Sequence, residues 1–165
     1  MDKNLIVSKI NSEVQGSVLE VRRFGRSEIF SIWIEAQSVH KVASVLRADP
    51  EISLDWLENL SVVEFAECLV VSYFLQSTTR PHSQIVLRAS VVPLSIDAEV
   101  EVPSIQAIWP MGAPMEQEAN ELFGVRFKSL PLERQFQSDF NLEGSLSRRL
   151  LPEVRGFPLR KKFVK

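Results

Sequence analysis

The 165-residue sequence has the composition and length of one globular domain. Hydrophobic residues make up 45% of it and charged residues 24%. Polar residues interrupt its apolar stretches within about ten positions, whereas a membrane-spanning helix needs roughly 20 apolar residues in succession. The single cysteine, Cys68, excludes an internal disulfide, and the first residues lack the pattern of a secretory signal. We therefore expect a cytoplasmic domain with a core of its own.

Charge is distributed unevenly along the chain. The formal net charge is −2, yet residues 148–165 contain seven basic residues and one acidic residue, a local balance of +6. The preceding residues therefore carry −8. An acidic body with a basic tail is consistent either with self-neutralisation or with an anionic partner for the tail.

The first predicted elements are a hairpin and a helix. Hydrophobic residues alternate around Gly25-Arg26-Ser27, which has the composition of a turn, so a β-hairpin is predicted at about residues 17–35. A helical pattern starts after Ser38 and ends before Asp49-Pro50, because proline disfavours helix at the preceding residue. Its apolar residues share one face, which predicts an amphipathic helix packed on a sheet. His40, in its first turn, is expected to face solvent.

Three more strands are predicted at residues 60–65, 68–76 and 84–92, which are rich in Val, Ile, Leu and aromatic residues. Cys68 begins the second of them, in an apolar run, and is expected to be a buried small hydrophobe rather than a nucleophile. The acidic segment that follows, residues 93–103, is expected to be extended. Ser104 is a suitable cap for the short segment after it.

A second helix is predicted at about residues 114–123, and it carries three acidic residues. Pro114 suits its first turn, and Gly124 suits its end. Glu116 and Glu118 are expected to complement the positive end of the helix dipole. On a helical wheel these two acids border an apolar stripe. The stripe consists of Met115, Ala119, Leu122 and Phe123.

These elements predict an α+β fold, a two-layer domain with a mainly antiparallel β-sheet packed by helices. One domain is expected over residues 1–147, in which residues 128–147 form a long loop because they lack a clear periodicity. Residues 148–165 are expected to form a basic, extended C-terminal tail, since Pro152 and Pro158 disfavour a helix there.

No metal-binding, phosphate-binding or nucleophile motif is present in the sequence. The glycines are too dispersed to form a phosphate loop. His40 and His82 each lack a second ligand at metal-site spacing. Glu118 and Glu121 share a helix face, so general acid and base catalysis stays open if burial raises the pKa of one carboxyl. Autonomous catalysis is not expected, because no histidine or other base lies nearby in sequence.

The tail sequence RGFPLRKKFVK mixes basic and apolar residues. Such a segment suits nucleic acid, a membrane surface, or an extended strap across a partner protein. The acidic remainder of the chain opposes nucleic-acid binding, and the prolines disfavour an amphipathic membrane helix. A strap is the interpretation that remains, with simple anion binding as an alternative that strong salt dependence would reveal.

Four segments in order, VEVPSIQAIWP, EQEANELFGVRF, SRRLLPE and GFPLRKKF, resemble the 30-kDa subunit of proton-pumping NADH:quinone oxidoreductase, respiratory complex I. The resemblance covers about residues 38–165. It departs from the family pattern at Gln117, Glu121 and Lys162, where arginine, aspartate and aspartate are usual, which marks a divergent member. Related subunits of membrane-bound hydrogenases and formate hydrogenlyase remain an alternative, as does a free-standing enzyme using paired carboxylates.

The resemblance implies a non-redox structural subunit of the peripheral arm, which supports electron transfer from NADH to quinone by docking to the cluster-bearing and quinone-site subunits. It implies no cofactor in this chain, whereas NADH, FMN, iron-sulfur clusters and quinone would bind to partner subunits. Membrane association would be indirect, on the cytoplasmic face of the inner membrane, and no nucleic-acid partner is implied.

The positions that match the family signatures are expected to form subunit interfaces. They are Glu116, Glu118, Glu121, Phe123, Gly124, Arg148, Arg149, Pro152, Gly156, Pro158, Leu159, Arg160 and Lys161. We expect the three glutamates to be scaffold charges that pair with arginines such as Arg148 and Arg149 or with a partner. The tail from Gly156 onward is expected to lie extended over a neighbouring subunit.

Overall fold

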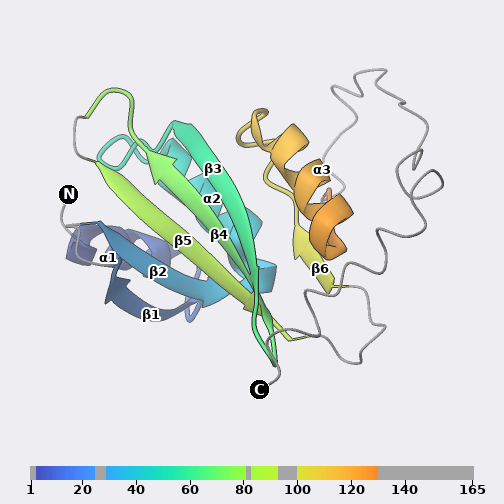
Figure 1. Cartoon of the computed structure of the whole chain (residues 1–165). Helices are drawn as coiled ribbons and strands as arrows, with labels where there is room; N and C mark the ends of the chain where they lie inside the picture. Colours follow the sequence, from blue (N-terminus) through green and yellow to red (C-terminus); the bar gives the residue numbers. More distant parts are fainter. Residues whose placement is uncertain (1–2, 25–28, 81–82, 93–99, 130–165) are drawn as a thin grey trace, which may run out of the picture. The chain divides into compact units, whose positions relative to one another are not determined.

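The computed structural model describes residues 3–24, 29–80, 83–92 and 100–129. The helices are α1 (Lys3–Glu13), α2 (Val39–Ala48) and α3 (Gly112–Phe123), and a 3-10 turn, η1 (Ala36–Ser38), precedes α2. The strands are β1 (Val18–Arg23), β2 (Phe30–Glu35), β3 (Trp56–Glu64), β4 (Leu69–Gln76), β5 (Gln84–Val91), β6 (Val100–Pro103) and β7 (Val125–Lys128). The predicted α+β class is confirmed (Figure 1).

Five strands form the main sheet in the order β1-β2-β5-β4-β3. Three of the strand pairs are antiparallel, and β2 and β5 are parallel, so the sheet is mainly antiparallel as predicted. The antiparallel pair of β1 and β2 occupies the segment where the hairpin is predicted. The chain passes through α2, β3 and β4 before β5 returns beside β2, and this return places β5 at the centre of the sheet.

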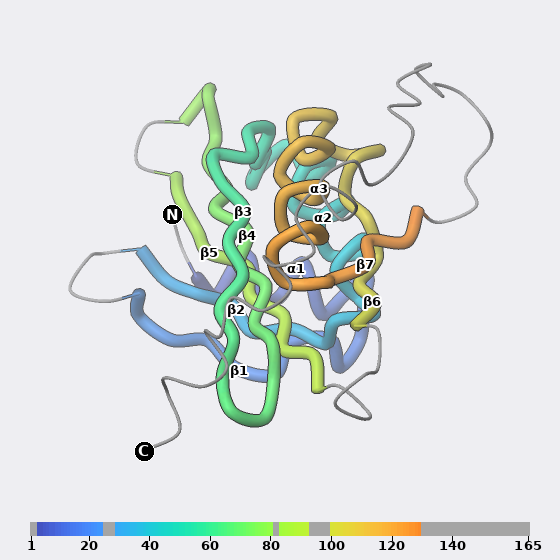
Figure 2. The backbone as a smooth tube through the Cα atoms, turned by 45° about the vertical axis from the view of Figure 1, so that its right-hand side comes forward, coloured from blue at the N-terminus to red at the C-terminus, as the bar shows by residue number. Residues whose placement is uncertain are grey.

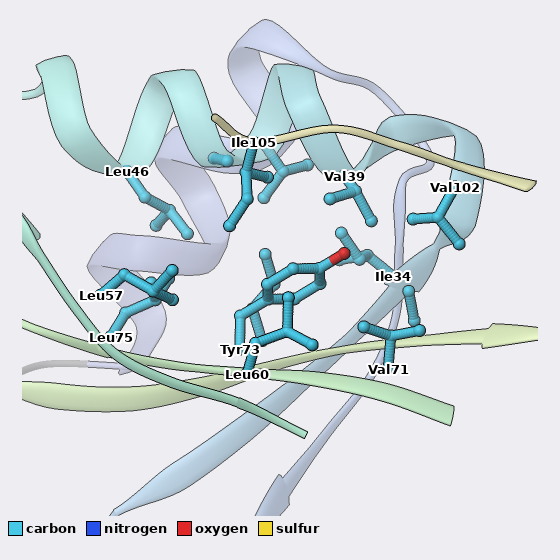
Figure 3. Packing of buried hydrophobic residues seen from close by; sticks show 14 of the residues in the cluster. Ile34, Val39, Leu46, Leu57, Leu60, Val71, Tyr73, Leu75, Val102 and Ile105 are labelled. Atoms are coloured by element: carbon cyan, nitrogen blue, oxygen red, sulfur yellow. The ribbon is translucent and has the colours of Figure 1, made fainter. Parts of the chain in front are cut away.

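The main core lies between one face of this sheet and the helices α1 and α2. Alternate residues of β4 point to this core, because successive side chains of a strand point to opposite faces. Figure 3 shows Tyr73 and Leu75 of β4 facing Val39 and Leu46 of α2. Each of these side chains is at most 1% exposed. The predicted amphipathic character of the segment after Ser38 therefore places α2 on the sheet.

Strands β6 and β7 form a second, parallel pair, and α3 connects them. Parallel neighbours need a crossover connection, which here is the loop after β6 together with α3. The helix lies against β3, on the side of the sheet that α2 also covers, and a Cβ added at Gly112 would lie 3.4 Å from Leu57 Cδ2. This unit brings the acidic helix onto the main core.

Helix α1 is an element that the sequence pattern does not predict. It buries Ile6 and Ile10 against the core. Lys9, on the same helix, places its Nζ 3.0 Å from Asp49 Oδ2 and 3.0 Å from Glu51 Oε2, just after α2. These ion pairs are partly exposed, so the buried isoleucines contribute most of the stabilisation.

Two predictions about single residues are wrong. Cys68 is half-buried in the turn between β3 and β4, where it precedes the strand instead of lying within it. His40 is expected at the surface but is only 8% exposed, because the segment after β6 lies against α2 and covers it. In the described ranges, no helix combines the length and apolar character that crossing a membrane requires.

Several predictions fall outside the described residues. These are the tail from residue 148, the boundary between residues 147 and 148, the loop from residue 130 onward, and the position of His82.

Candidate functional site

The acidic helix begins earlier than the sequence predicts. Helix α3 starts at Gly112, so Pro114 is in its first turn but Glu116 and Glu118 are in later turns, and the first turn carries no acidic residue. The interpretation that these two acids complement the helix dipole is therefore wrong, because that effect falls off within the first turn. The positions of Glu116 and Glu118 therefore need another explanation.

Glu116 is buried, with 1% of its surface exposed, and both of its oxygens accept hydrogen bonds. Oε1 accepts a bond of 2.8 Å from the Ile105 N–H. Oε2 accepts bonds of 2.8 Å from Ser104 Oγ and of 2.8 Å from Gln106 Nε2. The carboxylate thus holds the segment that follows β6 against α3.

Ser104 connects this site to two further elements. Its backbone N–H donates to the Lys128 carbonyl at the end of β7, at 2.7 Å. Its carbonyl oxygen lies 2.8 Å from His40 Nδ1 of α2. Since a carbonyl oxygen only accepts, Nδ1 carries the proton in this bond. Ser104 Oγ also accepts from the Gln106 N–H at 3.2 Å, as the predicted capping role requires.

Burial raises the pKa of the Glu116 carboxyl above its ordinary value of 4.5. The hydrogen bonds from Ile105, Ser104 and Gln106 oppose this rise, as does the charge of His40. The carboxylate is bonded to its own protein through both oxygens and only 1% of the residue is exposed, so a substrate does not reach it. Its arrangement is that of a structural anchor.

The outer face of α3 carries Gln117, Glu118, Glu121 and Leu122, and Met111 just before the helix continues it; all of these residues are exposed. Glu121 Oε1 accepts a bond of 3.1 Å from Gln117 Nε2. Glu118 makes no hydrogen bond or ion pair with any residue in the described ranges. Leu122 is 67% exposed, so its predicted place in the buried stripe is wrong, whereas Met115, Ala119 and Phe123 do pack on the core.

The structure therefore separates the three predicted acids. Glu116 points inward, and Glu118 and Glu121 lie on the exposed side of the same helix. The predicted pairing of the glutamates with Arg148 or Arg149 involves residues outside the described ranges. The other predicted positions from residue 148 onward also lie outside these ranges. In the part of the chain that the structure describes, no group of three or more His, Cys, Asp or Glu side chains could hold a metal ion.

Gly124 ends α3 in the left-handed conformation, with φ of +72°, as its predicted role as helix stop requires. A Cβ atom added there would meet no atom within 4 Å, so the cost of a side chain is conformational alone. Gly124→Ala is expected to lower the free energy of unfolding by about 1 kcal/mol in denaturant titrations of the full chain. Gly124→Asn should lose less, because asparagine tolerates this conformation; an alanine variant as stable as the original would contradict the account.

The sequence carries no direct signal for the contacts that Ser104 makes with Glu116 and His40. The glutamate lies 12 positions from Ser104, and His40 lies 64 positions away. A polar residue on the apolar face of a predicted helix is the available clue for His40, since such a side chain must find a partner when it is buried. Tyr73 in the core differs from His40, because its buried hydroxyl has no partner among the described residues.

The chain is similar to proteins of one family. The family described as "Respiratory-chain NADH dehydrogenase, 30 Kd subunit" matches residues 32–165. The chain is 28% identical over 166 residues to the NADH-quinone oxidoreductase subunit designated C of Roseiflexus sp. (strain RS-1), covering 98% of this chain and 83% of the relative. A shorter match, to the subunit of the same name in Azorhizobium caulinodans, is 36% identical over 66 residues, which is 40% of this chain and 31% of the relative.

Among solved structures, the fold is similar to the trypsin-resistant fragment (1-134) of Nqo5. The TM-score is 0.57 at 15% identity, and the match covers 78% of this chain and 99% of the fragment. This likeness supports the fold alone. The family match covers most of the chain and confirms the resemblance predicted from its motifs. The chain therefore belongs to the family of the 30-kDa subunit of respiratory-chain NADH dehydrogenase.

Proposed function

We propose that this chain is a non-redox structural subunit of the peripheral arm of NADH:quinone oxidoreductase. It supports electron transfer from NADH to quinone by docking to the cluster-bearing and quinone-site subunits, and it carries out no bond-making step itself. NADH, FMN, iron-sulfur clusters and quinone bind to those partners, through which the chain is held at the cytoplasmic face of the membrane. The relatives' names, which designate them as subunits of an NADH-quinone oxidoreductase, support membership of such a complex.

The division of α3 into two faces carries this proposal. Its inner face has a buried carboxylate, Glu116, whose hydrogen bonds are satisfied within the domain. Its outer face places Glu118 beside exposed apolar side chains, Met111 at 43% and Leu122 at 67%, which lie along one stripe at helical spacing. An acid without a partner in the described ranges, flanked by apolar surface, suits a protein interface with an arginine on the other side.

The outer face of α3 can be tested by reversing its charge in the full chain. A tagged chain is expressed in its own organism and captured from membranes, and the partners are identified by mass spectrometry. The double variant Glu118→Arg, Glu121→Arg is expected to recover about 100-fold less partner per captured chain, because like charges at an interface cost several kcal/mol. Thermal unfolding of the variant should change little, since both side chains are exposed.

Glu13→Arg is the matched control, because Glu13 is an exposed acid at the end of α1, away from α3 in the chain. It should recover as much partner as the unaltered chain. Equal recovery by the double variant would show that the outer face of α3 is not an interface. Turnover of a metabolite by the purified chain alone, or a capture from the unaltered chain that lacks every cluster-bearing subunit, would contradict the proposed function itself.

A further inference from the structure

The main sheet has a second face, opposite α1 and α2, over which no helix of the described part of the chain lies (Figure 2). Residues directly opposite on neighbouring strands point to the same face. The register therefore places Ser72 of β4, Arg88 of β5 and Trp33 of β2 in one row across this surface. We call this surface the open face. Its residues used below are Trp33, Trp56, Val63, Ser72, Phe74 and Arg88.

A cation lies at the centre of the open face. Arg88 belongs to β5, which is the middle strand of the sheet. Its guanidinium carbon lies 5.0 Å from the ring centre of Phe24 and 5.3 Å from that of Trp33. Two aromatic rings attract the cation and also remove water from around it. Arg88 is thus a partly desolvated charge held in a fixed position.

Two buried hydrogen-bond donors of this face lack an acceptor. Arg88 Nε and Trp33 Nε1 are both buried, and neither has a hydrogen-bond partner among the described residues. Glu20 is the acid opposite Trp33 in the register, but its carboxylate is bonded to Arg22. Buried donors without acceptors are rare in folded proteins, and each is costly. Unpaired donors and a positive charge on this face favour an acidic occupant over a basic one.

Polar and apolar side chains share this face: Ser72 lies opposite Arg88 in the register, and apolar side chains lie further out. Trp56 and Val63, on the edge strand β3, are 38% and 46% exposed. Phe74 packs edge-on against Phe24, with ring centres 5.8 Å apart. A fixed cation between two aromatic rings, with exposed apolar side chains on the same face, is typical of a protein interface.

We propose that the open face binds a protein segment that presents an aspartate or glutamate among apolar side chains. Its carboxylate pairs with the partly exposed guanidinium of Arg88, and its apolar side chains pack on Phe74, Trp56 and Val63. Charge complementarity selects an acidic segment, because Arg88 forms no ion pair within the described ranges and both unpaired groups are donors. This inference rests on the proposed function, since the segment is taken to belong to a partner subunit of the same complex.

The first test removes the cation but keeps the packing. Arg88→Met retains a long apolar side chain between the two rings, so the full-length variant should unfold at a temperature close to that of the original. Partner recovered by the tagged variant from membranes is expected to fall at least about 30-fold, as truncation of a buried charge pair does. Lys41→Met is the control, because Lys41 is an exposed cation on α2, on the other side of the sheet. The Lys41→Met chain should recover as much partner as the unaltered chain.

The second test does not depend on how the arginine variant folds. A photo-crosslinking phenylalanine analogue is placed at Val63, which is already exposed, and at Lys41 as the control. The crosslink from Val63 is expected to reach a peptide of a partner subunit that contains an acid, whereas Lys41 should yield none on that peptide. Arg88→Met in the same chain should reduce the Val63 crosslink by a similar factor.

The outcomes separate this inference from the proposed function. Normal recovery of cluster-bearing subunits by Arg88→Met, or a Val63 crosslink only to solvent or to a second copy of this chain, overturns the open-face inference alone. A lower unfolding temperature for Arg88→Met with unchanged recovery assigns Arg88 a purely internal role and also overturns it. If the unaltered chain captures no cluster-bearing subunits, that result contradicts the proposed function instead.

Discussion

Replacing Glu116 with alanine is expected to lower the free energy of unfolding by about 3 kcal/mol, the largest loss expected for any single side chain of α3. The variant leaves the buried N–H of Ile105 without an acceptor, and it removes the bonds from Ser104 and Gln106 as well. Ser104 and Ile105 are buried, so water replaces their lost bonds only if the loop moves, whereas the side chain of Gln106 is exposed and can bond to water. Denaturant titration of the full chain measures the loss.

Two substitutions make the test specific. Glu118→Ala changes an exposed acid of the same helix and should alter stability by no more than about 0.5 kcal/mol. Glu116→Gln keeps an acceptor for Ile105 and avoids burying a charge, so it should lose much less than Glu116→Ala. Equal losses for Glu116→Ala and Glu118→Ala would contradict the anchor role.

The pH dependence of the Glu116 effect has a defined sign. Burial raises the folded-state pKa of this carboxyl above its ordinary value of 4.5. Between these two pKa values the folded state binds more protons than the unfolded state, so stability falls as pH rises through that window and is constant above it. The stability of the original chain relative to Glu116→Gln should therefore decrease as pH rises from 4.5. Pairing of Glu116 with Arg148 or Arg149 would lower the pKa and give the opposite slope.

The hairpin region and α2 are predictable because their signals are local. Alternating residues around Gly25-Arg26-Ser27 and an apolar stripe that stops before Asp49-Pro50 each specify an element within a short window. The parallel pairing of β2 with β5 cannot be predicted from a local pattern, because it joins segments separated by a helix and two strands. Helix α1 escapes prediction for a different reason. It buries only Ile6 and Ile10, which is too few apolar residues for a clear helical pattern.

The composition of the candidate site is predictable, whereas its geometry is not. The helical wheel places Glu116 at the border of the packing face, which fits either an exposed or a buried side chain. Its burial depends on three donors in residues 104–106, and their approach depends on the crossover from β6 to α3. The wheel assigns Leu122 to the core because it is apolar, yet the helix ends before any described element covers it. Long-range packing, rather than local pattern, decides both positions.

Deletion of residues 156–165 is expected to abolish co-purification with partner subunits while leaving the domain folded. The elements that bury the core and the bonds to Glu116 all lie within residues 3–129, so the deletion removes none of them. Thermal unfolding of the shortened chain should therefore match that of the full chain, whereas partner recovery from membranes should be lost.

A charge-only variant separates two ways in which the tail could act. Substituting glutamine for Arg160, Lys161, Lys162 and Lys165 removes four positive charges and leaves the apolar positions Phe157, Leu159, Phe163 and Val164 unchanged. A strap that binds through pockets for its apolar side chains should keep part of its partner recovery in this variant and lose all of it in the deletion. Equal loss in both variants, with recovery of the original chain falling steeply as salt is added, would assign the tail to anion binding, because only an electrostatic contact depends strongly on salt. Full recovery by the deletion would exclude the tail from assembly.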